Sequence, residues 1–194
     1  MASPAFFYPL PVPVEIEKKY RVTKKQRDEL LRRLPKIGAT FHGEEFEENT
    51  LFGGDVLEVG RSVLRLRRLG TKAILTYKER FPSNKSIKRQ REDETTVGDP
   101  DAMEDILDSL GLAPRLVYEK RRATWKLGEA EIVLDELPFG LFMEIEGAEN
   151  EIKQIERQLA IKGLRAEHST YPQLTQRHGK QVGSVIEARF APKS

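Results

Sequence analysis

The 194-residue chain contains no cysteine and only three histidines, His42, His168 and His178. The absence of cysteine excludes disulfides, thiolate metal sites and cysteine nucleophiles, and three widely spaced histidines do not indicate a histidine-rich zinc site. No apolar run is long enough to cross a bilayer, and the N-terminus lacks the basic leader and apolar core of a secretory signal. We therefore expect a cytoplasmic protein without a membrane partner.

The chain also lacks an excess of positive charge, because 33 Lys and Arg residues nearly balance 31 Asp and Glu residues. General nucleic-acid binding and attachment to a membrane surface both require a basic excess, so neither is expected. Charge of both signs is nevertheless abundant, at 33% of the residues. The positions of the charges, rather than their sum, therefore carry the information about function.

Periodicity and turn residues predict one strand, one helix and then a long series of strands. The strands are expected at 12–22, 44–52, 63–69, 73–81, 88–97, 115–127, 130–137 and 142–147, and the helices at 24–34, 99–111, 149–164 and 170–179. This order differs from the strand–helix alternation of a parallel α/β sheet. We expect an α+β fold, namely a closed or nearly closed eight-stranded antiparallel β-barrel with helices packed outside.

Charged residues of like sign recur in pairs along these strands. Residues i and i+2 of a strand point to the same face, so each pair shares a face opposite apolar neighbours. Charge at every second residue also occurs where a strand simply exposes one face to water. Water-exposed sheets, however, gain from mixing charges of both signs, because adjacent like charges are destabilising. The pairs are Glu15 and Glu17, Arg65 and Arg67, Glu92 and Glu94, Lys120 and Arg122, and Glu144 and Glu146, and the single charged residues Lys19, Lys78 and Asp135 lie on the same kind of face.

Pairs of like sign become favourable when a ligand neutralises them. Carboxylate pairs suit a hard divalent cation such as Mg²⁺ or Mn²⁺, and basic pairs suit phosphate oxygens. So many charged side chains facing one another inside a barrel could not be buried dry, so the lumen must hold water, or a metal and a polyanion. The apolar faces of the strands would then point outward and need helices as cover.

The segment Glu15-Ile16-Glu17-Lys18-Lys19 resembles the ExExK signature of the CYTH superfamily, also called triphosphate tunnel metalloenzymes. The rest of the family's series follows in order over about residues 14–175: NTLF, LRLR, LTYK, an acidic strand before VGDP, EKRR, VLDEL and FGLFMEIEG. The resemblance implies a tunnel domain over residues 13–180, preceded by an arm at 1–12 and followed by a tail at 181–194.

The resemblance also implies ligands and residue roles. It implies Mg²⁺ or Mn²⁺ as cofactor, a substrate that is tripolyphosphate, a nucleoside triphosphate or thiamine triphosphate, and a homodimer as among related cyclases. Lys78, Glu17 and Glu146 are the expected catalytic residues. The expected metal ligands are Glu15, Glu17, Glu144 and Glu146, assisted by Asp135, Glu92 and Glu94, and the expected phosphate-binding residues are Lys19, Arg65, Arg67, Lys78, Lys120 and Arg122.

Two departures from the family bear on the reaction: the first weighs against a class IV cyclase and the second against a thiamine triphosphatase. We expect hydrolysis of a triphosphate ahead of cyclisation of ATP. Class IV adenylyl cyclases carry a His-Phe pair before ExExK, where this chain has Pro9-Leu10. Thiamine triphosphatases carry a tyrosine where this chain has Leu51. The alternatives are a class IV cyclase and a module that binds triphosphate without turnover, although a pure anion binder needs fewer carboxylates. A barrel without ligand would require ion pairing throughout the lumen.

Overall fold

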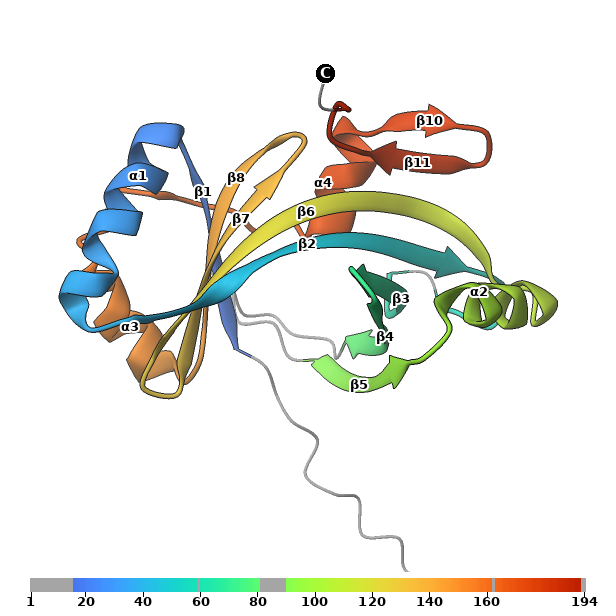
Figure 1. Cartoon of the computed structure of the whole chain (residues 1–194), viewed down its shortest axis with the longest axis horizontal. Coiled ribbons are helices and arrows are strands. Elements are labelled where there is room, and N and C mark those ends of the chain that lie inside the picture. Colours follow the sequence, from blue (N-terminus) through green and yellow to red (C-terminus); the bar gives the residue numbers. More distant parts are fainter. Residues whose placement is uncertain (1–15, 59, 81–89, 162, 193–194) are drawn as a thin grey trace, which may run out of the picture.

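The computed structural model describes residues 16–58, 60–80, 90–161 and 163–192. Within them the chain folds into one curved sheet with helices around it (Figure 1). The strands are β1 (Glu17–Val22), β2 (Thr40–Gly53), β3 (Ser62–Leu69), β4 (Lys72–Arg80), β5 (Gln90–Val97), β6 (Ala113–Leu127), β7 (Ala130–Leu137), β8 (Gly140–Glu146), β9 (Arg165–Ala166), β10 (Lys180–Val182) and β11 (Val185–Ala188). The helices are α1 (Lys24–Arg33), the 3-10 turn η1 (Pro35–Ile37), α2 (Pro100–Ser109), α3 (Glu149–Gln158) and α4 (Tyr171–His178).

The sheet is almost entirely antiparallel, which confirms the predicted α+β class. Its strand order is β5-β4-β3-β2-β6-β7-β8-β1-β9, and β11 joins β6 in the one parallel pairing among the described strands. The long strands β2 and β6 pair with each other from Thr40↔Lys126 to Gly53↔Ala113. Figure 1 shows these two strands running side by side along most of the molecule.

Two details of the predicted barrel are corrected. The described sheet has 11 strands rather than eight, because β9, β10 and β11 are two to four residues long and too short to show an alternating pattern. Among the described residues, the pairing path ends at β5 on one side and β9 on the other, and these two strands do not pair. The sheet is therefore curved but open along this path. The predicted arm at 1–12 lies outside the described residues.

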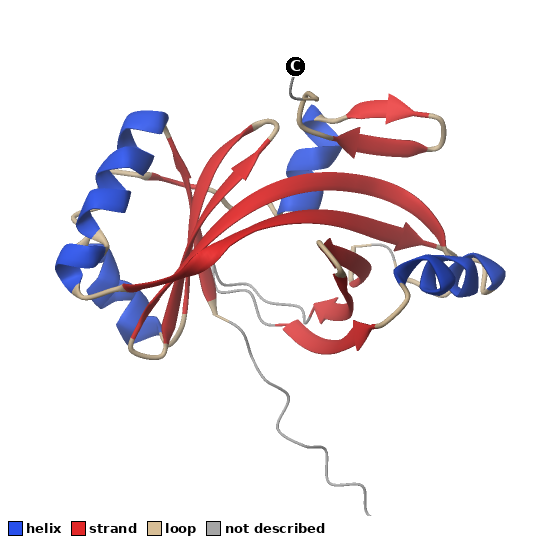
Figure 2. Ribbon diagram, viewed as in Figure 1, coloured by secondary structure: helices blue, strands red, loops and turns tan. Residues whose placement is uncertain are grey.

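Apolar strand faces point away from the charged face and are covered by helices, as predicted. One cluster joins the outer faces of β1, β7 and β8 to α1 and α3 through residues such as Leu30, Ile145 and Ile152. A second joins β3 and β4 to α2 through Leu66 and Leu107. Figure 2 shows α1 and α3 against one end of the sheet and α2 at the other. Burying these faces outside leaves the opposite, charged face free to line an interior cavity.

Helix α4 is fixed by a local signal at its start. Thr170 caps the helix: its hydroxyl accepts a hydrogen bond from the Gln173 amide at 3.3 Å, and the Gln173 side chain accepts one from the Thr170 amide at 2.9 Å. This reciprocal capping box sets the first turn of the helix. The first helical residue, Tyr171, is thereby held with its ring turned into the charged cavity.

The described part of the chain contains no helix that is both long and apolar enough to cross a membrane.

Candidate functional site

Cross-strand register places the predicted charged residues on one face of the sheet. Directly paired residues point to the same face, and Glu17 pairs with Glu146 while Lys19 pairs with Glu144. The same face continues through Arg122↔Asp135 and Lys78↔Glu92 on other strand pairs. The alternating pattern read from each strand therefore adds up to one continuous charged surface.

This surface encloses a cavity of about 290 Å³. Of the residues predicted from the sequence, all but two line it. Glu15 lies outside the described residues, and Asp135 is buried behind the cavity wall. The predicted residues that line the cavity are Glu17, Lys19, Arg65, Arg67, Lys78, Glu92, Glu94, Lys120, Arg122, Glu144 and Glu146.

Arg122 is the centre of an ion-pair network on the β6–β7–β8 wall. Its Nε and one terminal nitrogen donate to the two oxygens of Asp135 at 2.8 and 2.7 Å, a bidentate arrangement. The same terminal nitrogen donates to Glu144 at 2.8 Å, and Glu144 also pairs with Lys19 at 3.0 Å. Arg122 and Lys19 are thus held in the wall by carboxylates on neighbouring strands.

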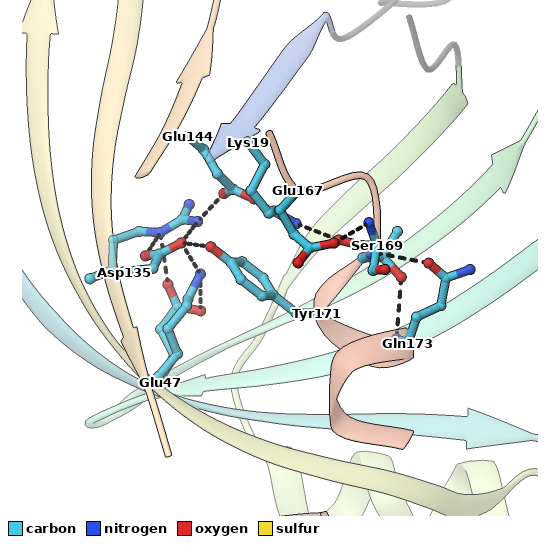
Figure 3. A network of polar contacts seen from close by, with 11 residues as sticks. Lys19, Glu47, Asp135, Glu144, Glu167, Ser169, Tyr171 and Gln173 are labelled. Atoms are coloured by element: carbon cyan, nitrogen blue, oxygen red, sulfur yellow. Dashed lines mark hydrogen bonds and ion pairs between the residues drawn. The ribbon is translucent and has the colours of Figure 1, made fainter. Parts of the chain in front are cut away.

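Tyr171 connects helix α4 to this network. Its hydroxyl donates to Asp135 at 2.7 Å, and the Lys19 ammonium lies 3.8 Å from the centre of its ring. Lys19 also donates to the Ser169 carbonyl at 3.4 Å, just before the helix. Figure 3 shows Tyr171 reaching from α4 toward Asp135, with Lys19 and Glu144 above it. The helix therefore closes one side of the cavity and restrains two of its charged groups.

The opposite wall is built from β3, β4 and β5. Lys78 pairs with Glu92 at 2.6 Å. Arg65 donates to the Thr76 hydroxyl at 3.3 Å, and that hydroxyl donates to Glu94 at 3.0 Å. Arg65 and Lys78 are therefore held by partners on the adjacent strands, at positions that line the cavity.

Two acidic residues of the site were not predicted from the sequence. Glu47 is 1% exposed and pairs with Lys120 at 3.1 Å. Glu131 lines the cavity and lies directly opposite Glu146. The signal for both was the same alternation, because Glu47 shares a strand face with Leu51, and Glu131 shares one with Asp135. Both also belong to like-sign pairs, Glu45 with Glu47 and Glu129 with Glu131, so the pattern could have revealed them.

Burial and neighbouring charges shift the pKa values of two buried groups of the site, Glu47 and Lys120. Burial alone raises the pKa of the Glu47 carboxyl, but Lys120, Arg67 and Arg122 together outweigh it and lower that pKa to about 2. Burial, reinforced by the nearby Arg122, lowers the pKa of the Lys120 ammonium to about 8, despite the opposing effect of Asp135 and Glu47. At neutral pH Glu47 is therefore ionised, and Lys120 lies close to its titration range.

One end of the cavity is rich in carboxylates. Glu17, Glu146 and Glu131 lie at the same level on the three neighbouring strands β1, β8 and β7. Like charges directly opposite repel one another, and oxygen donors suit a hard divalent cation, so the chemistry of this donor set fits Mg²⁺ or Mn²⁺. In the described part of the chain, however, no three acidic or histidine side chains stand close enough together to hold an ion in their present arrangement.

Comparisons with known proteins agree with this architecture. The sequence model of the CYTH domain family matches residues 14–171. A Methanocaldococcus jannaschii protein named "putative adenylate cyclase" is 28% identical over 151 residues, which cover 75% of this chain and 83% of that protein.

Solved structures show the same fold. A Pyrococcus horikoshii protein superimposes with a TM-score of 0.72 at 29% identity, covering 82% of this chain and 98% of the other. A Hippeastrum protein, named a "putative adenylyl cyclase" and described as having a dominant triphosphatase activity, superimposes with a TM-score of 0.64 at 20% identity, covering 88% and 98%.

Proposed function

The chain belongs to the CYTH family, and from this premise we propose that it is a divalent-metal-dependent enzyme that hydrolyses a triphosphate bound in the charged cavity. One observation carries the proposal: six basic side chains from four strands line a single cavity, and a carboxylate-rich end adjoins them. This division provides one region for phosphate oxygens and another for a cation. A structural core without a ligand would have to neutralise these charges by ion pairs alone.

The basic residues would bind the triphosphate chain. Arginine offers a planar fork that can contact two phosphate oxygens at once, and lysine offers a compact charge. With its oxygens neutralised from several sides, the triphosphate repels an attacking water less strongly. The residues proposed for this role are Lys19, Arg65, Arg67, Lys78, Lys120 and Arg122, of which Lys78 faces the cavity beside Glu92.

Glu17 and Glu146 are the proposed principal metal ligands. They face each other across the β1–β8 pairing, and Glu144 lies two residues before Glu146 on β8. A bound ion would supply charge stabilisation for the leaving phosphate. Glu15 and Glu144 remain proposed metal ligands, and Asp135, Glu92 and Glu94 keep their expected assisting roles. Asp135 and Glu144 both accept hydrogen bonds from Arg122. Their main proposed role is therefore to orient the Arg122 guanidinium toward the substrate.

Hydrolysis is proposed ahead of cyclisation. Leu51, where thiamine triphosphatases have tyrosine, lines the cavity and offers no hydroxyl, which weighs against thiamine triphosphate as the substrate. The description of the Hippeastrum protein also supports triphosphatase chemistry on this fold. The name of the Methanocaldococcus jannaschii relative favours cyclisation of ATP as the second candidate.

The test is to incubate the protein with Mg²⁺ or Mn²⁺ and, separately, tripolyphosphate, ATP and thiamine triphosphate, and to resolve the products by chromatography. We expect orthophosphate from tripolyphosphate, no cyclic AMP from ATP, and no turnover after chelation of the metal. Cyclic AMP with pyrophosphate would instead establish the cyclase. Binding of tripolyphosphate without any product would indicate a binding module.

A pH dependence follows from Lys120. With a pKa of about 8, this ammonium is largely charged at pH 7 and largely neutral at pH 9. We expect metal-free tripolyphosphate affinity to fall about tenfold over that interval, since only the charged form attracts phosphate. Calorimetric titration of the wild type and Lys120→Arg, whose guanidinium does not titrate there, isolates the effect from the titration of tripolyphosphate. Parallel pH curves for the two proteins would contradict this assignment.

A further inference from the structure

Glu47 occupies an unusual place behind the basic residues of the cavity. It is 1% exposed and is absent from the cavity lining, yet it pairs with three cations that do line the cavity. The distances are 3.1 Å to Lys120, 3.5 Å to Arg67 and 3.7 Å to Arg122. A carboxylate in this position contacts the proposed phosphate-binding groups without reaching the substrate.

The sheet topology explains how one side chain reaches all three. Strand β2 carries Glu47 and lies between β3, which carries Arg67, and β6, which carries Lys120 and Arg122. Glu47 is the direct register partner of Lys120. Asn49, two residues along β2 and opposite Arg67, donates a side-chain hydrogen bond to Glu47 at 3.2 Å. Glu47 is therefore fixed where two basic strands meet.

Three cations this close together repel one another before any phosphate arrives. Figure 3 shows Glu47 pointing from its strand toward Asp135 in the polar network. Asp135 also pairs with Lys120 and Arg122, at 3.7 and 2.7 Å. Glu47 adds the closest contact of Lys120 and a contact to Arg67, which comes from the other side of β2. It thereby links the two basic walls.

We propose that Glu47 is a positioning residue of the triphosphate site, which holds Lys120, Arg67 and Arg122 in the arrangement that binds phosphate oxygens. The inference rests on the proposed function, because it assumes that these cations bind a triphosphate. Glu47 itself contacts neither phosphate nor metal. Its carboxylate acts through the cations, in the way that buried partners orient the groups that contact a ligand.

The test is calorimetric titration of metal-free protein with tripolyphosphate. Glu47→Gln keeps the volume of the side chain and an oxygen for Asn49 but removes the negative charge. We expect about tenfold weaker binding, equivalent to roughly 1.4 kcal/mol, because the cations lose their common partner. The matched control is Glu48→Gln on the next residue, which pairs on the other face with Arg189 and should bind as the wild type does.

A double-mutant cycle separates positioning from a general effect on folding. If Glu47 acts through Lys120, Glu47→Gln should weaken binding little further in a Lys120→Met background. The inference would be overturned if Glu47→Gln weakened tripolyphosphate binding by the same factor in the Lys120→Met background as in the wild type. Wild-type affinity of Glu47→Gln would overturn it too. If Glu47→Gln fails to fold, Glu47→Asp is the second variant, because it keeps the charge but is too short to contact all three cations. Unchanged tripolyphosphate binding by Glu47→Asp would also overturn the inference.

The outcomes for the wild type distinguish the two proposals. Wild-type protein that binds no tripolyphosphate would overturn the proposed function and, with it, the role of Glu47. Wild-type protein that binds tripolyphosphate, together with variants of Glu47 that bind equally well, would overturn the role of Glu47 alone.

Discussion

Replacing Glu146 by alanine should lower metal-dependent turnover by about a thousandfold, because it removes a principal ligand of the ion that stabilises the leaving phosphate. Glu17→Ala, on the facing strand, should have a similar effect. Glu146 is exposed, so its replacement should leave the fold intact. The measurements are kcat for tripolyphosphate and Mn²⁺ affinity by calorimetry, with the thermal unfolding midpoint as a check on folding.

Glu129→Ala is the matched control for these two variants. Glu129 is exposed in the turn between β6 and β7, near the same end of the sheet, and does not line the cavity. Its loss should change neither turnover nor Mn²⁺ affinity. Normal turnover by Glu146→Ala or Glu17→Ala would disprove the metal assignment at this end of the cavity.

Replacing Arg122 by leucine should affect both stability and binding. Asp135 is 0% exposed and would lose its bidentate partner, and breaking a buried ion pair by removing one member costs about 3–5 kcal/mol. Part of this loss of stability should be offset, because Lys120 and Tyr171 still contact Asp135. Urea unfolding would measure the free energy of unfolding, and calorimetry would measure a weaker affinity for tripolyphosphate.

The neighbouring Arg121→Leu is the control, because residue 121 points to the opposite face of β6. The Arg121 side chain is 42% exposed and pairs with Glu136 at 3.4 Å, a surface contact worth no more than about 1 kcal/mol. Its replacement should leave tripolyphosphate affinity unchanged. Equal losses of stability in Arg122→Leu and Arg121→Leu would show that the ion-pair network around Asp135 does not stabilise the fold.

Strand alternation made much of the cavity predictable from the sequence. A pair such as Lys120 and Arg122 reveals its shared face without knowledge of any partner strand, because the side-chain period of a strand is two. The outward apolar faces and their helical cover follow from the same alternation. The α+β class was therefore predictable, as was the membership of most of the cavity wall.

Long-range pairing was not predictable in the same way. Segment 44–52 contains four glutamates, and only the pairing with β3 and β6 shows that Glu47 is buried among cations. The contact of Tyr171 with Asp135 joins a helix to a strand far away in the sequence, and no periodicity encodes it. Strands of two to four residues likewise give too little pattern to count, which is why eight strands were expected and 11 are present.

The position of β1 in the sheet has a consequence for biosynthesis. The first described strand pairs on one side with β8 and on the other with β9, so it has no neighbour from the first half of the chain. During translation, Glu17 and Lys19 leave the ribosome early but cannot join the sheet until residues 140–146 have been made. Such non-local pairings form slowly and late in folding. The charged cavity is therefore completed only near the end of synthesis, and an N-terminal fragment that ends before β8 cannot contain it.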